Sequence, residues 1–165
     1  MAVGIADVHK SIQSAWSAHG IDWEFKKYWV EADRTEYETI HDQEATPTQP
    51  FPYCVYELAT LLVESRDSGH DVTEKHQTLN IPCDFKVYAK KTGNQSPKVV
   101  AAALAEVLLG KFGGHPTVKP VQLVLDNGNV LLMQYQSEMS IREGDDEYSW
   151  MISYSIKVDV PVKVG

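Results

Sequence analysis

Histidine, cysteine and acidic side chains are the groups in this chain whose types and spacing could support metal binding or catalysis. The histidines are dispersed, and the only local pair, His70 and His76, lies in a polar segment beside Asp71 and Glu74. This spacing matches no recognised metal-binding pattern. We therefore expect no metal site and no cofactor.

Two other catalytic arrangements also fit the sequence poorly. The glycine-containing run 110–114 follows a helical pattern instead of joining a strand to a helix, as a phosphate-binding loop would. Cys54 and Cys83 lie in apolar stretches, which oppose the thiolate that a cysteine nucleophile needs. The chain is expected not to be an enzyme. A hydrolase that brings scattered carboxylates together on folding stays open as an alternative.

Composition limits the class of protein. At 165 residues the chain is one domain by size, and its two cysteines are too few for a disulfide framework. No segment approaches 18 uninterrupted apolar residues, and residues 1–19 mix charged with apolar types, so neither an export signal nor a membrane span is predicted. The formal net charge of −8, from 23 acidic and 15 basic residues, argues against binding nucleic acid through its phosphates.

The elements that must position these residues include one exceptionally long strand. From Tyr148 to Val164 every even-numbered residue is apolar, and most odd-numbered residues are polar. This alternation predicts a strand with one buried face, far longer than the usual five or six residues. A straight strand of this length would reach roughly 55 to 60 Å, more than a domain of this size covers. The strand must therefore bend, or its end must leave the domain.

Two helices and several shorter strands precede it. Helices are predicted over residues 3–19, with Gly20 as the stop, and from Ser96-Pro97 to Gly113-Gly114. Strands are predicted over residues 53–63, 79–90, 121–125 and 131–141; a helix over 58–63 is the competing interpretation. Pro82 suggests an edge or a bulge in the second of these strands.

The last two strands are predicted to form a hairpin. With its loop centred on Gly144-Asp145, the register pairs apolar with apolar residues: Ile141 with Tyr148, Met139 with Trp150, Tyr135 with Tyr154, Met133 with Ile156 and Leu131 with Val158. All of these residues are therefore expected on one buried face.

The segment 21–52 has the weakest pattern. Its aromatic residues are clustered without clear periodicity, and three prolines follow between residues 46 and 52. It is expected to contain one or two short strands, or to be an extension that becomes ordered against a neighbouring subunit.

These elements predict one α+β domain over residues 1–165. We expect a mostly antiparallel sheet of four to five strands with two helices packed on one face, in the order α-β-β-α-β-β(-β).

Four of these features occur together in a known arrangement. They are the N-terminal helix, the strand Pro52-Tyr53-Cys54-Val55-Tyr56-Glu57 after a proline-rich approach, the helix that begins at Ser96-Pro97, and the closing strand that ends Tyr154-Ser155-Ile156-Lys157-Val158-Asp159-Val160. This arrangement resembles the tail terminator and related neck or tail-completion proteins of tailed bacteriophages. The resemblance covers most of the chain, as an order of elements without a diagnostic motif.

The resemblance implies a structural virion protein of the tail or neck, assembled in the host cytoplasm. Such a protein forms a ring, often a hexamer, on the finished end of the tail tube, stops its polymerisation and joins it to the head. Its implied partners are further copies of itself, the tail tube protein and the head-tail connector protein; DNA passes through without specific binding, and no membrane is involved. Because the segment 21–52 departs from the simplest pattern, another neck or tail-completion component stays open. So does a small ligand-binding α+β domain.

Two sets of residues are predicted to be working surfaces. Acids suited to a channel wall are Glu36, Glu38, Asp42, Glu44, Asp145 and Asp146, with solvated loops as the alternative. An oligomer interface is predicted from strand addition by a C-terminal arm over residues 160–165 and from aromatic anchors, with core packing and a frayed terminus as alternatives. Its residues are Trp23, Phe25, Tyr28, Trp29, Val160, Pro161, Val162 and Val164.

Overall fold

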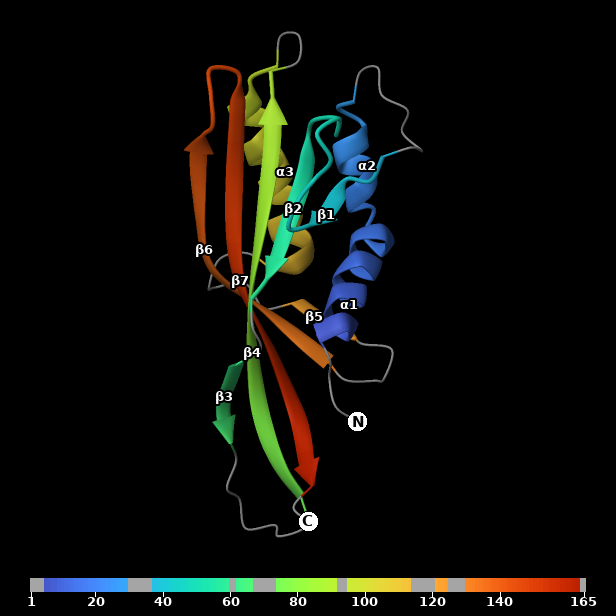
Figure 1. The fold of residues 1–165 in the computed structure, drawn as a ribbon, viewed down its shortest axis with the longest axis vertical. Helices are drawn as coiled ribbons and strands as arrows, with labels where there is room; N and C mark the ends of the chain where they lie inside the picture. Colours follow the sequence, from blue (N-terminus) through green and yellow to red (C-terminus); the bar gives the residue numbers. More distant parts are fainter. Residues whose placement is uncertain are drawn as a thin grey trace.

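The computed structural model describes residues 5–29, 37–59, 62–66, 74–91, 95–113, 121–124 and 130–163. These residues form three helices and one seven-stranded sheet (Figure 1). The helices are α1 (Ile5–Ala18), α2 (Ile21–Lys26) and α3 (Pro97–Phe112); the strands are β1 (Ile40–Asp42), β2 (Tyr53–Leu58), β3 (Leu62–Arg66), β4 (Glu74–Lys90), β5 (Val121–Val124), β6 (Val130–Arg142) and β7 (Glu147–Lys163). The α+β class is confirmed. The predicted order and element counts need correction, because α2, β1 and β3 are additional elements.

The sheet is mixed. Its strands lie in the spatial order β1-β2-β4-β7-β6-β5, and β3 also pairs with β4. The β1–β2 pair is parallel and the other pairs are antiparallel. At the centre, β4 and β7 pair along their full length of 17 residues each.

The weakly patterned segment 21–52 contains both a helix and a strand. α2 follows Gly20, whose φ of 69° lies in the left-handed region that glycine adopts without a steric penalty. A helix of six residues is too short to reveal its period in the sequence. β1 pairs with β2 at the sheet edge, so this segment contains a short strand, one of the two alternatives predicted for it.

One hydrophobic core lies between the helices and one face of the sheet. The ring of Phe85 on β4 lies 6.5 Å from Trp16 of α1 and 5.1 Å from Phe112 of α3, and Trp16 lies 5.2 Å from Phe25 of α2. The helices therefore share the sheet face that carries Phe85. The face of α1 that the sequence predicted is buried at Val8, Ile12, Ala15 and Trp16.

Pro82 lies where the edge of β4 changes partner. β2 pairs with residues 83–88 of β4 and β3 with residues 77–80, which leaves a gap between them. The Pro82 carbonyl accepts a hydrogen bond of 2.9 Å from the N–H of Ala59, so the backbone polar groups of Pro82 face this gap. A missing N–H costs little there. The single strand predicted over residues 53–63 is therefore two strands, on one edge of a central strand.

A one-residue irregularity divides the β6–β7 hairpin. Tyr135 pairs with Tyr154 and Met133 with Ile156, as predicted. Between Tyr135 and Ser137 the register shifts, so Met139 pairs with Met151 and Ile141 pairs with Ser149 instead of the predicted Trp150 and Tyr148. The bulge has a structural consequence, because it moves Met139 and Ile141 to the sheet face opposite the helices.

Seven of the 17 residue pairs between β4 and β7 extend beyond the helices. Residues 74–80 of β4 pair with residues 157–163 of β7, and β3 pairs with the outer edge of β4 there. We call this part, together with β3, the ribbon. Figure 1 shows it reaching away from the helix-covered body. The expectation that the closing strand leaves the domain is thus met by a paired ribbon instead of a single arm.

Candidate functional site

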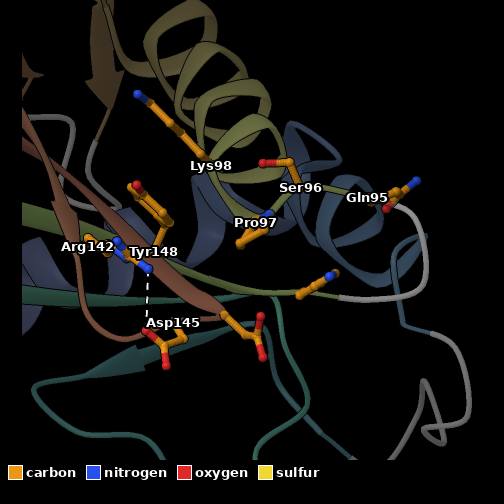
Figure 2. A pocket seen from close by; sticks show the side chains of 9 residues that line it. Gln95, Ser96, Pro97, Lys98, Arg142, Asp145 and Tyr148 are labelled. Carbon is orange, nitrogen blue, oxygen red and sulfur yellow. Dashed lines mark hydrogen bonds and ion pairs between the residues drawn. The ribbon is translucent and has the colours of Figure 1, made fainter.

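A cavity of about 450 Å³ lies where the start of α3 meets the β6–β7 hairpin (Figure 2). The N–H of Lys91 donates to the carbonyl of Asp146 at 2.7 Å, and Arg142 contacts Asp145 at 3.3 Å. The remaining lining residues are Gln95, Ser96, Pro97, Lys98 and Tyr148. This lining mixes cations, anions and neutral polar groups. It suits a small polar ligand better than an apolar one.

The sequence predicted the two elements that line this cavity, the start of the helix and the hairpin turn, but it did not predict the cavity. The capping position Ser96, the proline after it and the turn near Gly144 were visible as local signals. Their meeting depends on the pairing of β4 with β7, which brings Lys90 opposite Glu147. No local pattern reports that contact.

A second candidate surface is the sheet face opposite the helices. Strand pairing aligns two rows of residues across β2, β4, β7 and β6 on this face. The first row is Tyr53, Tyr88, Ser149 and Ile141; the second is Val55, Lys86, Met151 and Met139. We call these two rows the open face.

Aromatic and charged contacts order the open face. The rings of Tyr53 and Tyr88 stack with centroids 5.1 Å apart, and the Lys86 ammonium lies 4.9 Å from the centroid of the Tyr88 ring. Burial, with a contribution from Tyr88, raises the pKa of Tyr53 to about 12. Tyr53 therefore presents a neutral, amphipathic surface at physiological pH.

Glu143 connects the hairpin to the open face. It accepts a hydrogen bond of 2.7 Å from the Ser149 hydroxyl and lies 3.0 Å from the Lys86 ammonium. The hydrogen bond from Ser149 and, to a smaller extent, the one from Lys86 lower the pKa of Glu143. Burial lowers the pKa of Lys86, but hydrogen bonds to Glu143 and Tyr88 outweigh it, so the net shift is upward. Both groups stay ionised near neutrality.

A third cluster joins α1 to the β1–β2 edge. The Tyr56 hydroxyl accepts a hydrogen bond of 3.2 Å from Gln13 and lies 2.8 Å from Nδ1 of His9, which is 3.8 Å from Asp42. Burial raises the pKa of Tyr56, so its hydroxyl is a donor and not a base at neutral pH. The cluster shares no residue with the cavity lining. Its geometry is that of a structural contact between elements.

The two cysteines lie inside the core. Cys54 and Cys83 are both fully buried and free. Burial raises the pKa of each thiol well above its usual value. Neither is available as a nucleophile, in agreement with the sequence interpretation.

The four aromatic residues of the predicted interface separate into two groups. Phe25 and Trp29 are buried within the single chain, and the Trp29 indole N–H donates to the carbonyl of Pro52 at 2.9 Å. Core packing, the alternative left open for them, describes both. Trp23 is 54% exposed and Tyr28 is partly buried, so these two keep surface for a partner.

The predicted channel acids occupy two separate places. Glu38, Asp42 and Glu44 are exposed at and around the edge strand β1, whereas Asp145 and Asp146 are exposed in the β6–β7 hairpin. Asp42 approaches His9, and Asp145 is paired with Arg142. A single copy does not bring the two groups together, since β2, β4 and β7 lie between them. Glu36 is outside the described residues.

The C-terminal interface residues lie largely in the ribbon. Val160 pairs with Gln77, Pro161 with His76 and Val162 with Lys75, so this stretch is a paired strand and not a free arm. Val164 is outside the described residues, as are His70 and Asp71. Among the residues that the structure describes, no group of three or more metal-ligating side chains gathers. No helix in the same part of the chain is long and apolar enough to span a membrane.

Comparison with known proteins gives little further information. No family model and no curated protein matches the chain. A solved structure bearing only a sequence identifier covers 91% of this chain and 94% of its own, at 20% identity and a TM-score of 0.39. A likeness of that size supports no conclusion about fold or function.

Proposed function

We propose that this chain is a structural protein of a tailed-phage virion, a tail terminator that forms a ring on the tail tube. In this role it stops tube polymerisation and joins the tube to the head connector, without catalysis or cofactor. The order of the secondary-structure elements in the sequence suggested this role. The observation that supports it best is the ribbon, which extends beyond the helix-covered body (Figure 1).

The ribbon favours self-association for a physical reason. Val158, Val160 and Val162 continue the alternation of the closing strand, and the register places these positions on the same sheet face as the buried Ile156. In the body, helices cover that face. In the ribbon, Figure 1 shows no helix over it. Further copies of the chain would supply the cover, and a contact between different surfaces of successive copies generates a ring when the rotation closes.

Pro161 changes the expected mode of contact from strand addition to face packing. In the β4–β7 register Pro82 pairs with Ser155, and because the backbone polar groups of Pro82 point away from β7, those of Ser155 point away from β4. Pro161 lies an even number of residues from Ser155 along β7, so its backbone polar groups also point away from β4. The β6 ladder ends at Lys157, which leaves this edge without a strand among the described residues. A proline there removes a donor that an added strand would need, as in edges protected against pairing.

The molar mass in solution tests the proposal. Light scattering after size exclusion, across a concentration series, is expected to show a closed assembly, near six times the 18.5 kDa chain mass for a hexamer. Deleting residues 161–165 should weaken assembly and leave the fold intact, because residues 161–163 pair only within the ribbon. A chain that stays monomeric at every concentration, with and without purified tail tubes, contradicts the proposal.

The cavity in Figure 2 favours the alternative of a small ligand-binding domain. A ligand at 100 times its Kd would stabilise the chain by roughly 2.7 kcal/mol. Thermal unfolding with a panel of small polar acids and amines is the measurement. A monomer whose melting temperature rises with one of them would favour this alternative over the ring.

A further inference from the structure

We propose that the open face is the surface on which the ribbon of the neighbouring copy docks. This inference rests on the proposed ring and names its two contacting surfaces. The contact is a sheet-on-sheet packing between different parts of two identical chains.

The open face is unusually apolar for a sheet surface without helices. An antiparallel sheet with one face on the core normally carries polar residues on the other. Here the two rows contain Tyr53, Val55, Ile141, Met151 and Met139, and the Met139 side chain is 49% exposed. The next row, Glu57, Asp84, Ser153 and Ser137, is polar. The apolar part therefore has a boundary, as interface centres do.

The bulge in β6 creates this surface. Without a register shift, Met139 and Ile141 would share the core face with Met133 and Tyr135, as their spacing in the sequence implies. The shift turns them outward instead. A bulge that turns the exposed Met139 and the partly buried Ile141 away from the core lowers the stability of an isolated chain unless a partner covers them.

The ribbon and the open face cannot satisfy each other within one copy. The positions of Val158, Val160 and Val162 lie on the helix side of the sheet, and the open face is on the opposite side. They can meet only between copies. Because the two surfaces differ, the contact is heterologous and leaves each copy with one free ribbon and one free face, as a ring requires.

The dimensions indicate a weak single contact. Seven paired residues give the ribbon a length of roughly 23 Å. Its width is about 14 Å where β3 pairs with residues 77–80 and about 10 Å where only β4 and β7 continue. Its face is then on the order of 300 Å², below the roughly 800 Å² that each partner contributes to a standard stable interface. Pairs should therefore dissociate readily, and ring closure, in which every copy uses both surfaces, should provide the stability.

Two variants, each with a matched control, test the inference. Met139→Asp places a charge on the open face; its control, Ser140→Asp, changes the neighbouring exposed residue, which lies on the other side of the strand. Val160→Lys changes the ribbon; its control, Thr78→Lys, changes a ribbon position on the opposite face. Circular dichroism and urea unfolding show whether each variant folds. Each test variant should raise the concentration for half-assembly about tenfold or more, and each control by less than about twofold.

Mixing the two test variants distinguishes a contact between two different surfaces from a contact between two identical surfaces. Met139→Asp retains a working ribbon and Val160→Lys retains a working open face. Because a single contact is weak, the mixed pair should form only at concentrations well above those at which the unmodified chain closes rings, and it should reach twice the 18.5 kDa chain mass and nothing larger. A mixture that at those concentrations associates no more than either variant alone, or that grows beyond two copies, overturns the inference and leaves the proposed function standing. So does a Met139→Asp variant that assembles normally. An unmodified chain that never self-associates overturns both.

Discussion

The hydrogen bond between Tyr154 and Gly113 connects the closing strand to the end of α3. The Tyr154 hydroxyl donates to the Gly113 carbonyl at 2.6 Å, and both residues are buried. Tyr154→Phe removes the donor and keeps the ring, which packs against Phe85 with centroids 5.8 Å apart. The carbonyl then stays buried without this partner. A buried polar group left unsatisfied costs roughly 1–3 kcal/mol.

Urea unfolding measures this loss. For a domain of this size, 1 kcal/mol shifts the melting temperature by roughly 2–4 °C, so the effect is also visible in a thermal scan. Tyr148→Phe is the control, because Tyr148 lies on the same face of the same strand and none of the hydrogen bonds found among the described side chains involves its hydroxyl. A loss below about 0.5 kcal/mol for Tyr154→Phe, or a loss equal to that of the control, would refute the reasoning.

Three further predictions follow from buried or paired groups. Thr39→Val should cost roughly 1–3 kcal/mol in urea unfolding, since buried Thr39 accepts from the Trp16 indole at 2.9 Å and donates to Asp22 at 2.5 Å; an unchanged midpoint would argue against this network. Glu143 has a lowered pKa in the fold, so its contribution is present above the unfolded value of about 4.3 and is lost as the pH falls through the folded value. Glu143→Gln should therefore be less stable than the unmodified chain at pH 7, and the difference should shrink below about pH 4; a difference independent of pH would contradict this. Cys54 and Cys83 should react with a thiol reagent only as fast as the chain unfolds, and rapid labelling of the native protein would show that the core opens locally.

The elements with a long hydrophobic period were predictable. α1 and α3 lie within two residues of their predicted bounds, since capping residues and a helical apolar face agree there. The inner part of the β6–β7 register was also predicted, at Tyr135–Tyr154 and Met133–Ile156. In each case several residues report the same periodicity.

Short elements and changes of register were not predictable. α2 has six residues and β1 three, too few for a period to emerge. The bulge between Tyr135 and Ser137 leaves the odd-numbered apolar pattern of β6 intact in the sequence and divides it between two faces in space.

Of the predicted sites, the buried Phe25 and Trp29 show why apolar type alone does not identify an interface. The cavity and the open face depend on strand pairings distant in sequence.

The bulge and the two prolines together explain why this sheet favours contact through its faces. Pro82 faces a gap between β2 and β3, and Pro161 faces an edge beyond the end of β6, so neither weakens the central β4–β7 ladder. Pro161 also makes that edge a poor template for another strand. The bulge at the same time places Met139 and Ile141 on the uncovered face. A sheet with a protected edge and an apolar outer face can associate through the face without the unlimited edge-to-edge pairing that leads to aggregation. A closed ring needs this restriction, because each copy must accept one neighbour on each side and no more.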